Sequence, residues 1–246
     1  MRLRLPLNFI LTFLALTFVM HEAHEIVHTT IGRIICGCWG LRDFNVWDLC
    51  EGCAEQKAIS IIATFAGPAF TFIMIWIGAY LIGKNKTNDQ KAFGFSLIFA
   101  NIPFARILTA SIGGGDEVWG LYQLLKNHPL AWTIGLITVV IITIIPLYKA
   151  FMLIENKSRI GWFLLFFLAP TVIDLLLVMG LMNTVLENGI LSNYWILGSP
   201  ILVTLWTITV TTIFILTRKN ICLVADNKLL TISLYNNDSI VKTPPL

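Results

Sequence analysis

Charge is scarce in this chain of 246 residues: only 13% of the residues are Asp, Glu, Lys or Arg, and 57% are hydrophobic. A soluble globular domain carries charge on about a quarter of its residues, so the composition excludes an ordinary soluble domain. The formal net charge of +3 is too small to favour nucleic-acid binding. A small-residue cleavage site is also lacking after the first apolar run. We therefore expect that run to be a retained membrane helix and not a removable signal peptide.

The chain contains long apolar runs in place of charged residues. Six of them reach the length of about 20 residues that a bilayer crossing needs, and backbone groups in hydrocarbon must bond to one another, which makes each run a helix. The sequence predicts an all-α polytopic membrane protein, with about six transmembrane helices in residues 1–219 and a short tail in residues 220–246. Two apolar runs flank a turn in the tail and are compatible with a β-hairpin. The predicted segments are 5–35, 58–82, 92–112, 130–151, 160–182 and 194–216.

The connections between these segments alternate in charge. Basic residues dominate before the first segment, in the second and fourth connections and after the last segment, whereas the first, third and fifth connections are neutral or acidic. Cytoplasmic connections carry the excess of Lys and Arg. The pattern therefore predicts a multi-pass integral membrane protein with both termini in the cytoplasm.

Three of the four histidines lie in one short stretch after the first apolar run. His24, Glu25 and His28 form the motif H-E-x-x-H. On a helix, residues i and i+4 share a face, so both imidazoles reach one metal ion, and the Glu meets the water bound there. The motif predicts one catalytic zinc ion, with His24 and His28 as ligands and Glu25 as the general base. The plainer alternative is a polar patch at the membrane interface.

A catalytic zinc site usually takes a third ligand from the protein. Asp116 is the first candidate, because it follows the glycine run 113–115, which allows the backbone to approach closely. Glu117 is an adjacent substitute. Asp174 is the competitor, because an aspartate inside a span is a functional candidate by default, as a ligand, as the partner of a ligand or as a helix contact. His21, one turn before the motif, is a candidate partner of a ligand or an alternative ligand.

These motifs resemble those of the site-2 protease family of intramembrane zinc metalloproteases. That family carries H-E-x-x-H in one membrane helix, a segment with Gly-Pro, and a later Asn/Pro/Asp/Gly motif that supplies the third ligand. The resemblance covers roughly residues 5–120, in which H-E-x-x-H is followed by Gly67-Pro68, Asn101-Ile102-Pro103 and Gly113-Gly114-Gly115-Asp116.

The resemblance implies that zinc-activated water cleaves a membrane-embedded or juxtamembrane peptide. The expected partners are thus a transmembrane protein or membrane peptide and the lipid bilayer, with no nucleic acid. In this interpretation the zinc ligands are His24, His28 and Asp116, and the base is Glu25. Two departures stand out: the aspartate follows its glycines, whereas in the family it commonly precedes them, and Thr71 stands where the family often has Asn.

The Gly-Pro and Asn-Ile-Pro motifs are expected to position the substrate, through Gly67, Pro68, Asn101 and Pro103. Backbone that is exposed near a broken helix binds an extended peptide as an added strand. Both motifs also have an ordinary role in membrane helices, as kinks or close packing points. Arg106 is expected to pair with Asp174 or with a carboxylate of the active site, because an isolated charge in a span is costly.

Four of the five cysteines lie in the first connection, residues 36–57. Their spacing is C-x-C followed by C-x2-C, which predicts two disulfides if the connection is extracytoplasmic and a structural zinc site if it is cytoplasmic. The charge pattern favours the disulfides. The four are Cys36, Cys38, Cys50 and Cys53, and we expect Cys222 to be a free thiol.

Two other classes of function fit the same residues. A metal-binding membrane transporter or sensor would use the histidines and carboxylates without hydrolysis, and would move zinc without cleaving any membrane peptide. A catalytically inactive relative would act as a membrane scaffold. The intact Glu25 argues against a scaffold, because metal binding alone does not need it.

Overall fold

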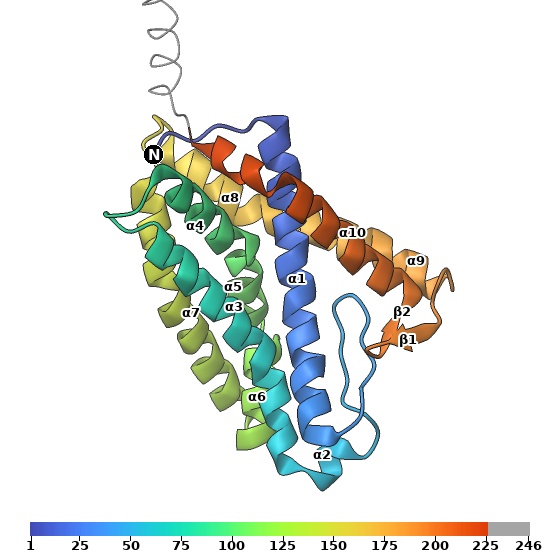
Figure 1. The fold of residues 1–246 in the computed structure, drawn as a ribbon. Helices are drawn as coiled ribbons and strands as arrows, with labels where there is room; N and C mark the ends of the chain where they lie inside the picture. The colour runs from blue at the N-terminus through green and yellow to red at the C-terminus, as the bar shows by residue number, and fades with distance from the viewer. Residues whose placement is uncertain (226–246) are drawn as a thin grey trace, which may run out of the picture.

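The computed structural model describes residues 1–225, and almost all of its regular structure is helical (Figure 1). The α-helices are α1 (Leu7–Cys36), α2 (Cys53–Gln56), α3 (Ile61–Leu81), α4 (Asn88–Ala100), α5 (Pro103–Ser111), α6 (Asp116–Leu125), α7 (His128–Leu153), α8 (Arg159–Asp174), α9 (Asn183–Glu187) and α10 (Ile201–Thr217). Two 3-10 helices, η1 (Ala58–Ser60) and η3 (Arg218–Val224), and one π-helix, η2 (Leu175–Met182), extend them. The short strands β1 (Tyr194–Ile196) and β2 (Ser199–Pro200) pair antiparallel.

Six of the resulting helical segments are long and apolar enough to cross a membrane, which confirms the predicted all-α architecture and fits a multi-pass membrane protein. They are Leu7–Cys36, Ala58–Leu81, Asn88–Ser111, His128–Leu153, Arg159–Glu187 and Ile201–Val224. The predicted start of the last segment was wrong, because Tyr194 to Ile196 form strand β1 and the helix begins only at Ile201. Leu197 and Gly198, both with positive φ, make the two-residue turn between β1 and β2.

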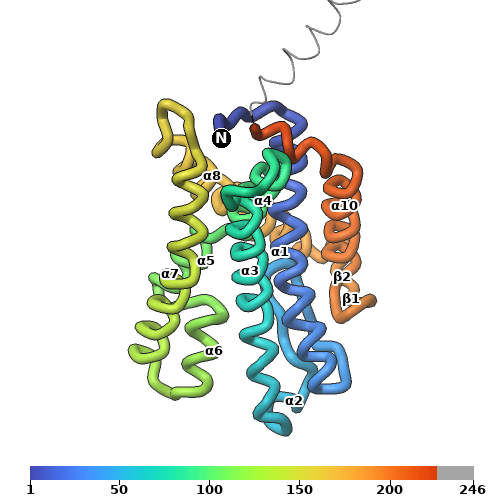
Figure 2. Tube along the Cα trace, turned by 60° about the vertical axis from the view of Figure 1, so that its left-hand side comes forward, coloured from blue at the N-terminus to red at the C-terminus, as the bar shows by residue number. Residues whose placement is uncertain are grey.

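Helix α1 stands at the centre of the bundle, with α3 on one side and α10 on the other (Figures 1 and 2). The N-terminal segment lies beside the end of η3, where Leu3 bridges to Ala225 and the Arg4 amide donates to the Val224 carbonyl at 2.9 Å. The two ends of the described chain therefore share one side of the bundle. In the tail, the first arm of the expected hairpin lies in η3, and the rest of the hairpin lies outside the described residues.

The hydrophobic core near this end is built from aromatic rings. The ring of Phe166 of α8 contacts Phe9 and Phe13 of α1 as well as Phe95 and Phe99 of α4, with ring centroids 4.9 to 6.1 Å apart. Such contacts between large buried rings hold helices firmly. The other end of α1 holds the polar residues, so the bundle is packed by apolar contacts at one end and carries its site toward the other.

The third span is broken where the sequence reads Asn101-Ile102-Pro103. Ile102 has φ 41°, a left-handed conformation that ends α4, and Pro103 opens α5 with a fixed φ that suits a first helical turn. After α5, Gly113 and Gly115 also have positive φ. These turns direct the chain back into α6, which lies between α3 and α7 at the end opposite the N-terminus (Figure 2).

Candidate metal site and its cavity

His24 and His28 lie one turn apart on α1 and point the same way. Both side chains are buried, and their Nε2 atoms are 3.0 Å apart. The distance along the helix from Leu7 to His24 is about 26 Å, which places the pair toward the end of α1 that leads into the cysteine-rich connection. Helical spacing thus brings the two imidazoles together as the sequence predicts.

Helix α3 fixes the orientation of both rings. The Nδ1 atom of His28 lies 2.7 Å from the carbonyl oxygen of Ala63, and the Nδ1 atom of His24 lies 2.9 Å from the Thr71 hydroxyl. The His28 contact requires a proton on Nδ1, since a carbonyl only accepts. It leaves Nε2 free to bind a metal, as partners of ligating histidines commonly do. Thr71 provides this support at the position where the resembling family often has Asn.

Gly67 of α3 makes room for His28. A Cβ atom at this position would stand close to the imidazole, 2.1 Å from Nε2, where no side chain fits. Gly67 and Pro68 are both buried within α3. Gly67 of the predicted motif therefore lies against a candidate ligand, and the role of Gly67 and Pro68 in positioning a substrate stays a prediction.

Asp116 opens α6 and completes the cluster. Its Oδ2 atom lies 3.2 Å from Nε2 of His24 and 3.5 Å from Nε2 of His28. Burial raises the pKa of this carboxyl, but hydrogen bonds with both histidines and the charge of Arg106 outweigh it and hold the pKa well below its usual range. Asp116 is therefore a carboxylate, the form that binds a cation.

The three side chains fit a zinc ion. Their ligand atoms lie 3.0 to 3.5 Å from one another, and ligands about 2.0 to 2.1 Å from a tetrahedral zinc are spaced by about 3.3 Å. Two imidazole nitrogens and one carboxylate are also a donor set that catalytic zinc sites use, with a fourth position left open. The residues present therefore suit the metal that H-E-x-x-H predicts.

Glu25 is buried beside this cluster, and its Oε2 atom has no hydrogen-bond partner within residues 1–225. Glu25, His24 and Asp116 line one cavity of about 240 Å³. A buried carboxylate oxygen without a partner is costly, and a bound water or substrate in the cavity would satisfy it.

Arg106 of α5 reaches into the same cluster. Its Nη1 atom lies 3.1 Å from Oδ2 of Asp116, and its Nη2 atom lies 2.6 Å from Nε2 of His24. Of its two predicted partners, the structure has a carboxylate of the candidate metal site, Asp116, and not Asp174. The guanidinium brings positive charge to the ligand carboxylate and ties α5 to α6.

The other carboxylates proposed as ligands lie apart from the histidine pair. Glu117 points toward Arg106, with Oε2 4.0 Å from its Nη1, and burial raises its pKa against the opposing charge of Arg106. Asp174 instead pairs with His21, through Oδ1 and Nδ1 at 2.7 Å. Within the described residues, only His24, His28 and Asp116 form a group able to share one metal ion.

Asn101 contributes a free acceptor to the cavity. Its Nδ2 donates to the Leu97 carbonyl at 2.7 Å, while its Oδ1 is buried without a partner among the described residues. The backbone of Ile102 is already used: its amide donates to Phe99, and its carbonyl accepts from Ala105 and Arg106. The Asn101 side chain, unlike the backbone of Ile102, therefore has an acceptor left for a bound molecule.

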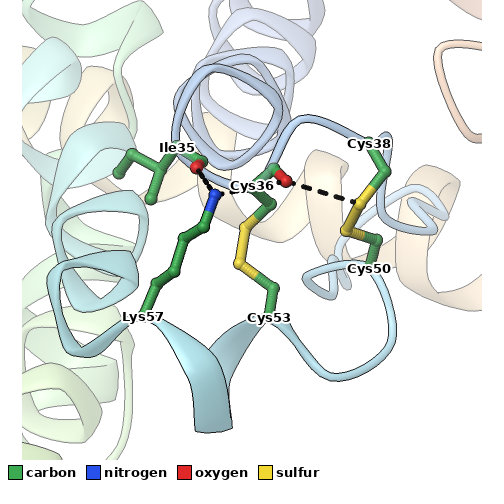
Figure 3. Close-up of a disulfide and its surroundings, with 6 residues drawn as sticks. All are labelled: Ile35, Cys36, Cys38, Cys50, Cys53 and Lys57. Carbon is green, nitrogen blue, oxygen red and sulfur yellow. Dashed lines mark hydrogen bonds between the residues drawn. A yellow bond between two sulfur atoms is a disulfide. The ribbon is translucent and has the colours of Figure 1, made fainter.

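The first connection covers the site and is closed by two disulfides, Cys36–Cys53 and Cys38–Cys50 (Figure 3). Lys57 donates to the Ile35 carbonyl at 2.6 Å and so caps the end of α1. Of the two arrangements left open by the sequence, the structure has the disulfides. Cys222 is the fifth cysteine and is free, as expected.

Trp47 of this connection was not singled out from the sequence. Its ring stacks on His28, with centroids 4.5 Å apart and planes 12° from parallel. A second cavity, of about 900 Å³, lies between the connection and α6, and Trp47 and Asp116 line both cavities. A lone Trp in a loop gives no spacing signal, so only the fold reveals its place.

No spacing pattern in the sequence indicated the buried ion pair between Arg42 and Glu22 either. Arg42 of the connection donates from Nη1 to Oε2 of Glu22 on α1 at 2.9 Å, and Thr207 of α10 donates to the same oxygen at 2.7 Å. Arg42 also donates to the Ser199 hydroxyl at 3.0 Å. The pair ties the connection to α1, α10 and β2.

Comparison of the chain with models of protein families, with curated proteins and with solved structures finds no match in any of the three. The resemblance to site-2 proteases thus rests on the quoted motifs alone.

Proposed function

We propose that this protein is an intramembrane zinc metalloendopeptidase that cleaves a membrane-embedded or juxtamembrane peptide. One observation carries the proposal: ligand atoms of His24, His28 and Asp116 converge within 3.5 Å, and Glu25 lines the same cavity as His24 and Asp116. A pure metal-binding site needs the first three residues and has no use for the fourth. Hydrolysis needs all four, because a base must take a proton from the attacking water.

Zinc, when bound by these three ligands, would lower the pKa of a water molecule and polarise a peptide carbonyl. Glu25 takes the proton from that water as its oxygen adds to the carbonyl carbon. The same carboxyl then gives the proton to the leaving nitrogen as the C–N bond breaks. Thr71 and the Ala63 carbonyl keep the two imidazoles oriented throughout, through the contacts at 2.9 and 2.7 Å.

Water and substrate would reach the site from the side of the disulfide-closed connection. The cavity of about 900 Å³ extends from this connection to Asp116, whose side chain is 26% exposed. Disulfides persist in oxidising compartments, which supports an extracytoplasmic position for this side. Both chain ends would then lie in the cytoplasm, as the charge pattern also indicates.

The test uses purified full-length protein in proteoliposomes with a library of single-span peptides labelled at both ends. We expect zinc-dependent cleavage by the wild type and none by Glu25→Gln, with one zinc per chain retained in that variant. Asp116→Asn should lose both zinc and cleavage, because even the partners of metal ligands contribute about 10–100-fold to metal affinity.

Two results would contradict the proposal. Cleavage by Glu25→Gln at the wild-type rate would remove the base from the mechanism. Zinc flux into the vesicles without cleavage of any peptide would instead favour the transporter.

A further inference from the structure

His21 lines the cavity and pairs with the buried Asp174, and the proposed mechanism uses neither residue. We propose that His21 is a catalytic residue that donates a hydrogen bond to the peptide oxygen as negative charge develops on it, and that Asp174 is a positioning residue that holds His21 for this task. The role rests on the proposed proteolysis.

His21 faces the reacting groups. It lies one turn before both His24 and Glu25 on α1, at i−3 and i−4, which puts the three side chains on one face of the helix. All three line the cavity of about 240 Å³. His21 is not one of the residues that form the candidate metal group. Because it lines the cavity, it can contact a bound peptide without being a metal ligand.

The contact with Asp174 determines which nitrogen is available. Nδ1 of His21 lies 2.7 Å from Oδ1 of Asp174, and Nε2 has no hydrogen-bond partner within the described chain. A carboxylate beside Nδ1 stabilises a proton on the ring and fixes its orientation. With Nδ1–H donating to Asp174, Nε2 is a donor when the ring is an imidazolium, which is the form that a neighbouring carboxylate favours.

The backbone around Asp174 supports a functional position. Asp174 is the last residue of α8, four residues after Pro170, and the π-helix η2 begins at Leu175. π-Helical turns are rare and occur frequently at functional sites. Its side chain is 7% exposed and that of His21 is 11% exposed. Asp174 thus holds from behind a side chain, His21, that itself lines the cavity of Glu25.

The chemistry needs a donor at this place. When water oxygen adds to the carbonyl carbon, the π electron pair moves onto the carbonyl oxygen, which gains negative charge. Nε2–H of His21 donates to that oxygen, the lone pair then re-forms the C=O bond, and the C–N bond breaks as nitrogen takes the proton from Glu25. The donor is itself unchanged at the end. Loss of one such donor in hydrolases lowers kcat by about 10²–10³-fold.

The experiment compares His21→Phe, which removes the donor, with His21→Gln, whose amide nitrogen can replace Nε2. His128→Gln is the matched control, since His128 begins α7 away from the cavity. For a peptide that the wild type cleaves, we expect kcat to fall about 100-fold in His21→Phe with KM nearly unchanged, and to recover partly in His21→Gln. Asp174→Asn should lower kcat less than His21→Phe and shift the pH profile of kcat.

Two readouts do not depend on turnover. A phosphinic-acid version of the same peptide mimics the tetrahedral oxygen, so its affinity should fall about 100-fold in His21→Phe, while the affinity of the intact peptide stays within about 2-fold. The visible spectrum of the Co²⁺-substituted protein should not change, because His21 is not a ligand.

The outcomes separate the two proposals. Wild-type kcat and phosphinic-peptide affinity in His21→Phe, with Glu25→Gln inactive, would overturn the role of His21 and leave the protease standing. A changed Co²⁺ spectrum would also overturn it, because His21 would then be a ligand. Cleavage by Glu25→Gln would overturn the proposed function itself.

Discussion

The first three spans and the last three differ in how they are buried. Half of the most apolar stretch of α1 is buried within the protein, and so is 56% of that of the third span, against 28% and 11% for the fifth and sixth spans. The first group encloses the candidate metal ligands and Glu25, whereas α7, α8 and α10 expose many large apolar side chains on their outer faces. In a bilayer those faces would contact lipid.

The difference shows that the polar residues of the site lie on the helices that are most buried within the protein. The three candidate ligands, Glu25 and Arg106 come from α1, α5 and α6, where neighbouring helices surround them and exclude lipid. The outer spans provide only the partners of those residues and of their neighbours, such as Asp174 for His21 and Thr207 for Glu22. Substitutions in the inner spans should therefore lower zinc affinity and cleavage directly, and those in the outer spans should act only through the positions and the stability of the inner residues.

The largest expected effect comes from a single methyl group in the inner part. Gly67→Ala would place a Cβ atom 2.1 Å from Nε2 of His28. The ring cannot easily move aside, because Ala63 holds its Nδ1 and Trp47 stacks on its face. We expect zinc affinity to fall by at least about 100-fold, measured by competition with a zinc-binding dye, and peptide cleavage to fall with it.

Gly180→Ala is the matched control in the outer part. The nearest atom to a Cβ there is the Leu175 carbonyl oxygen at 3.4 Å, an ordinary contact on an exposed part of η2. We expect zinc affinity within about 2-fold of the wild type, because the change touches no ligand or partner. Equal loss in both variants would show that the inner and outer spans do not differ as described.

A smaller effect, on stability, is expected where the two groups of spans meet. Arg42→Met would leave the buried Glu22 carboxylate without its positive partner. Breaking one side of a buried ion pair costs roughly 3–5 kcal/mol, so the variant should unfold at a clearly lower temperature in detergent while binding zinc below that temperature.

The double variant Glu22→Leu/Arg42→Met isolates the cause. Removing both charges of such a pair is often neutral, so we expect the double variant to regain most of the lost stability. A double variant as unstable as Arg42→Met would mean that packing of the connection, and not the unpaired charge, determines the loss.

The architecture and the candidate metal group of His24, His28 and Asp116 could be predicted from the sequence. Apolar length fixes the six spans, and helical spacing brings His24 and His28 together, because both are local properties of the chain. The break at Asn101 to Pro103 was also indicated, but the structure shows its backbone bonded within the turn, so an added substrate strand at Ile102 has no free groups there.

The remaining parts depend on contacts between distant segments. Trp47 reaches His28, and Asp174 reaches His21 across 153 residues. No spacing rule links such positions, since their meeting follows from how the spans pack. The start of the sixth span was misjudged because an apolar run of 194–200 satisfies strand pairing as well as helix. Gly198 within this run was the one local indication of a turn between two strands.

The smallest expected effect is at the contact between the first and fifth connections, which joins the inner part to the outer part. The Tyr194 hydroxyl donates to Oδ1 of Asp43 at 2.8 Å, and burial together with this bond raises the pKa of Tyr194 to about 12. The folded protein then holds this proton more tightly than the unfolded chain, whose tyrosines have a pKa of about 10. The contact therefore contributes its full stability below about pH 10 and loses it as the pH rises toward 12.

Tyr194→Phe should lack this decline, whereas Tyr148→Phe, at an exposed position of α7, should keep it. Unfolding temperatures measured from pH 9 to 11.5 compare the three proteins, and an identical decline in all three would show that the contact contributes nothing to stability.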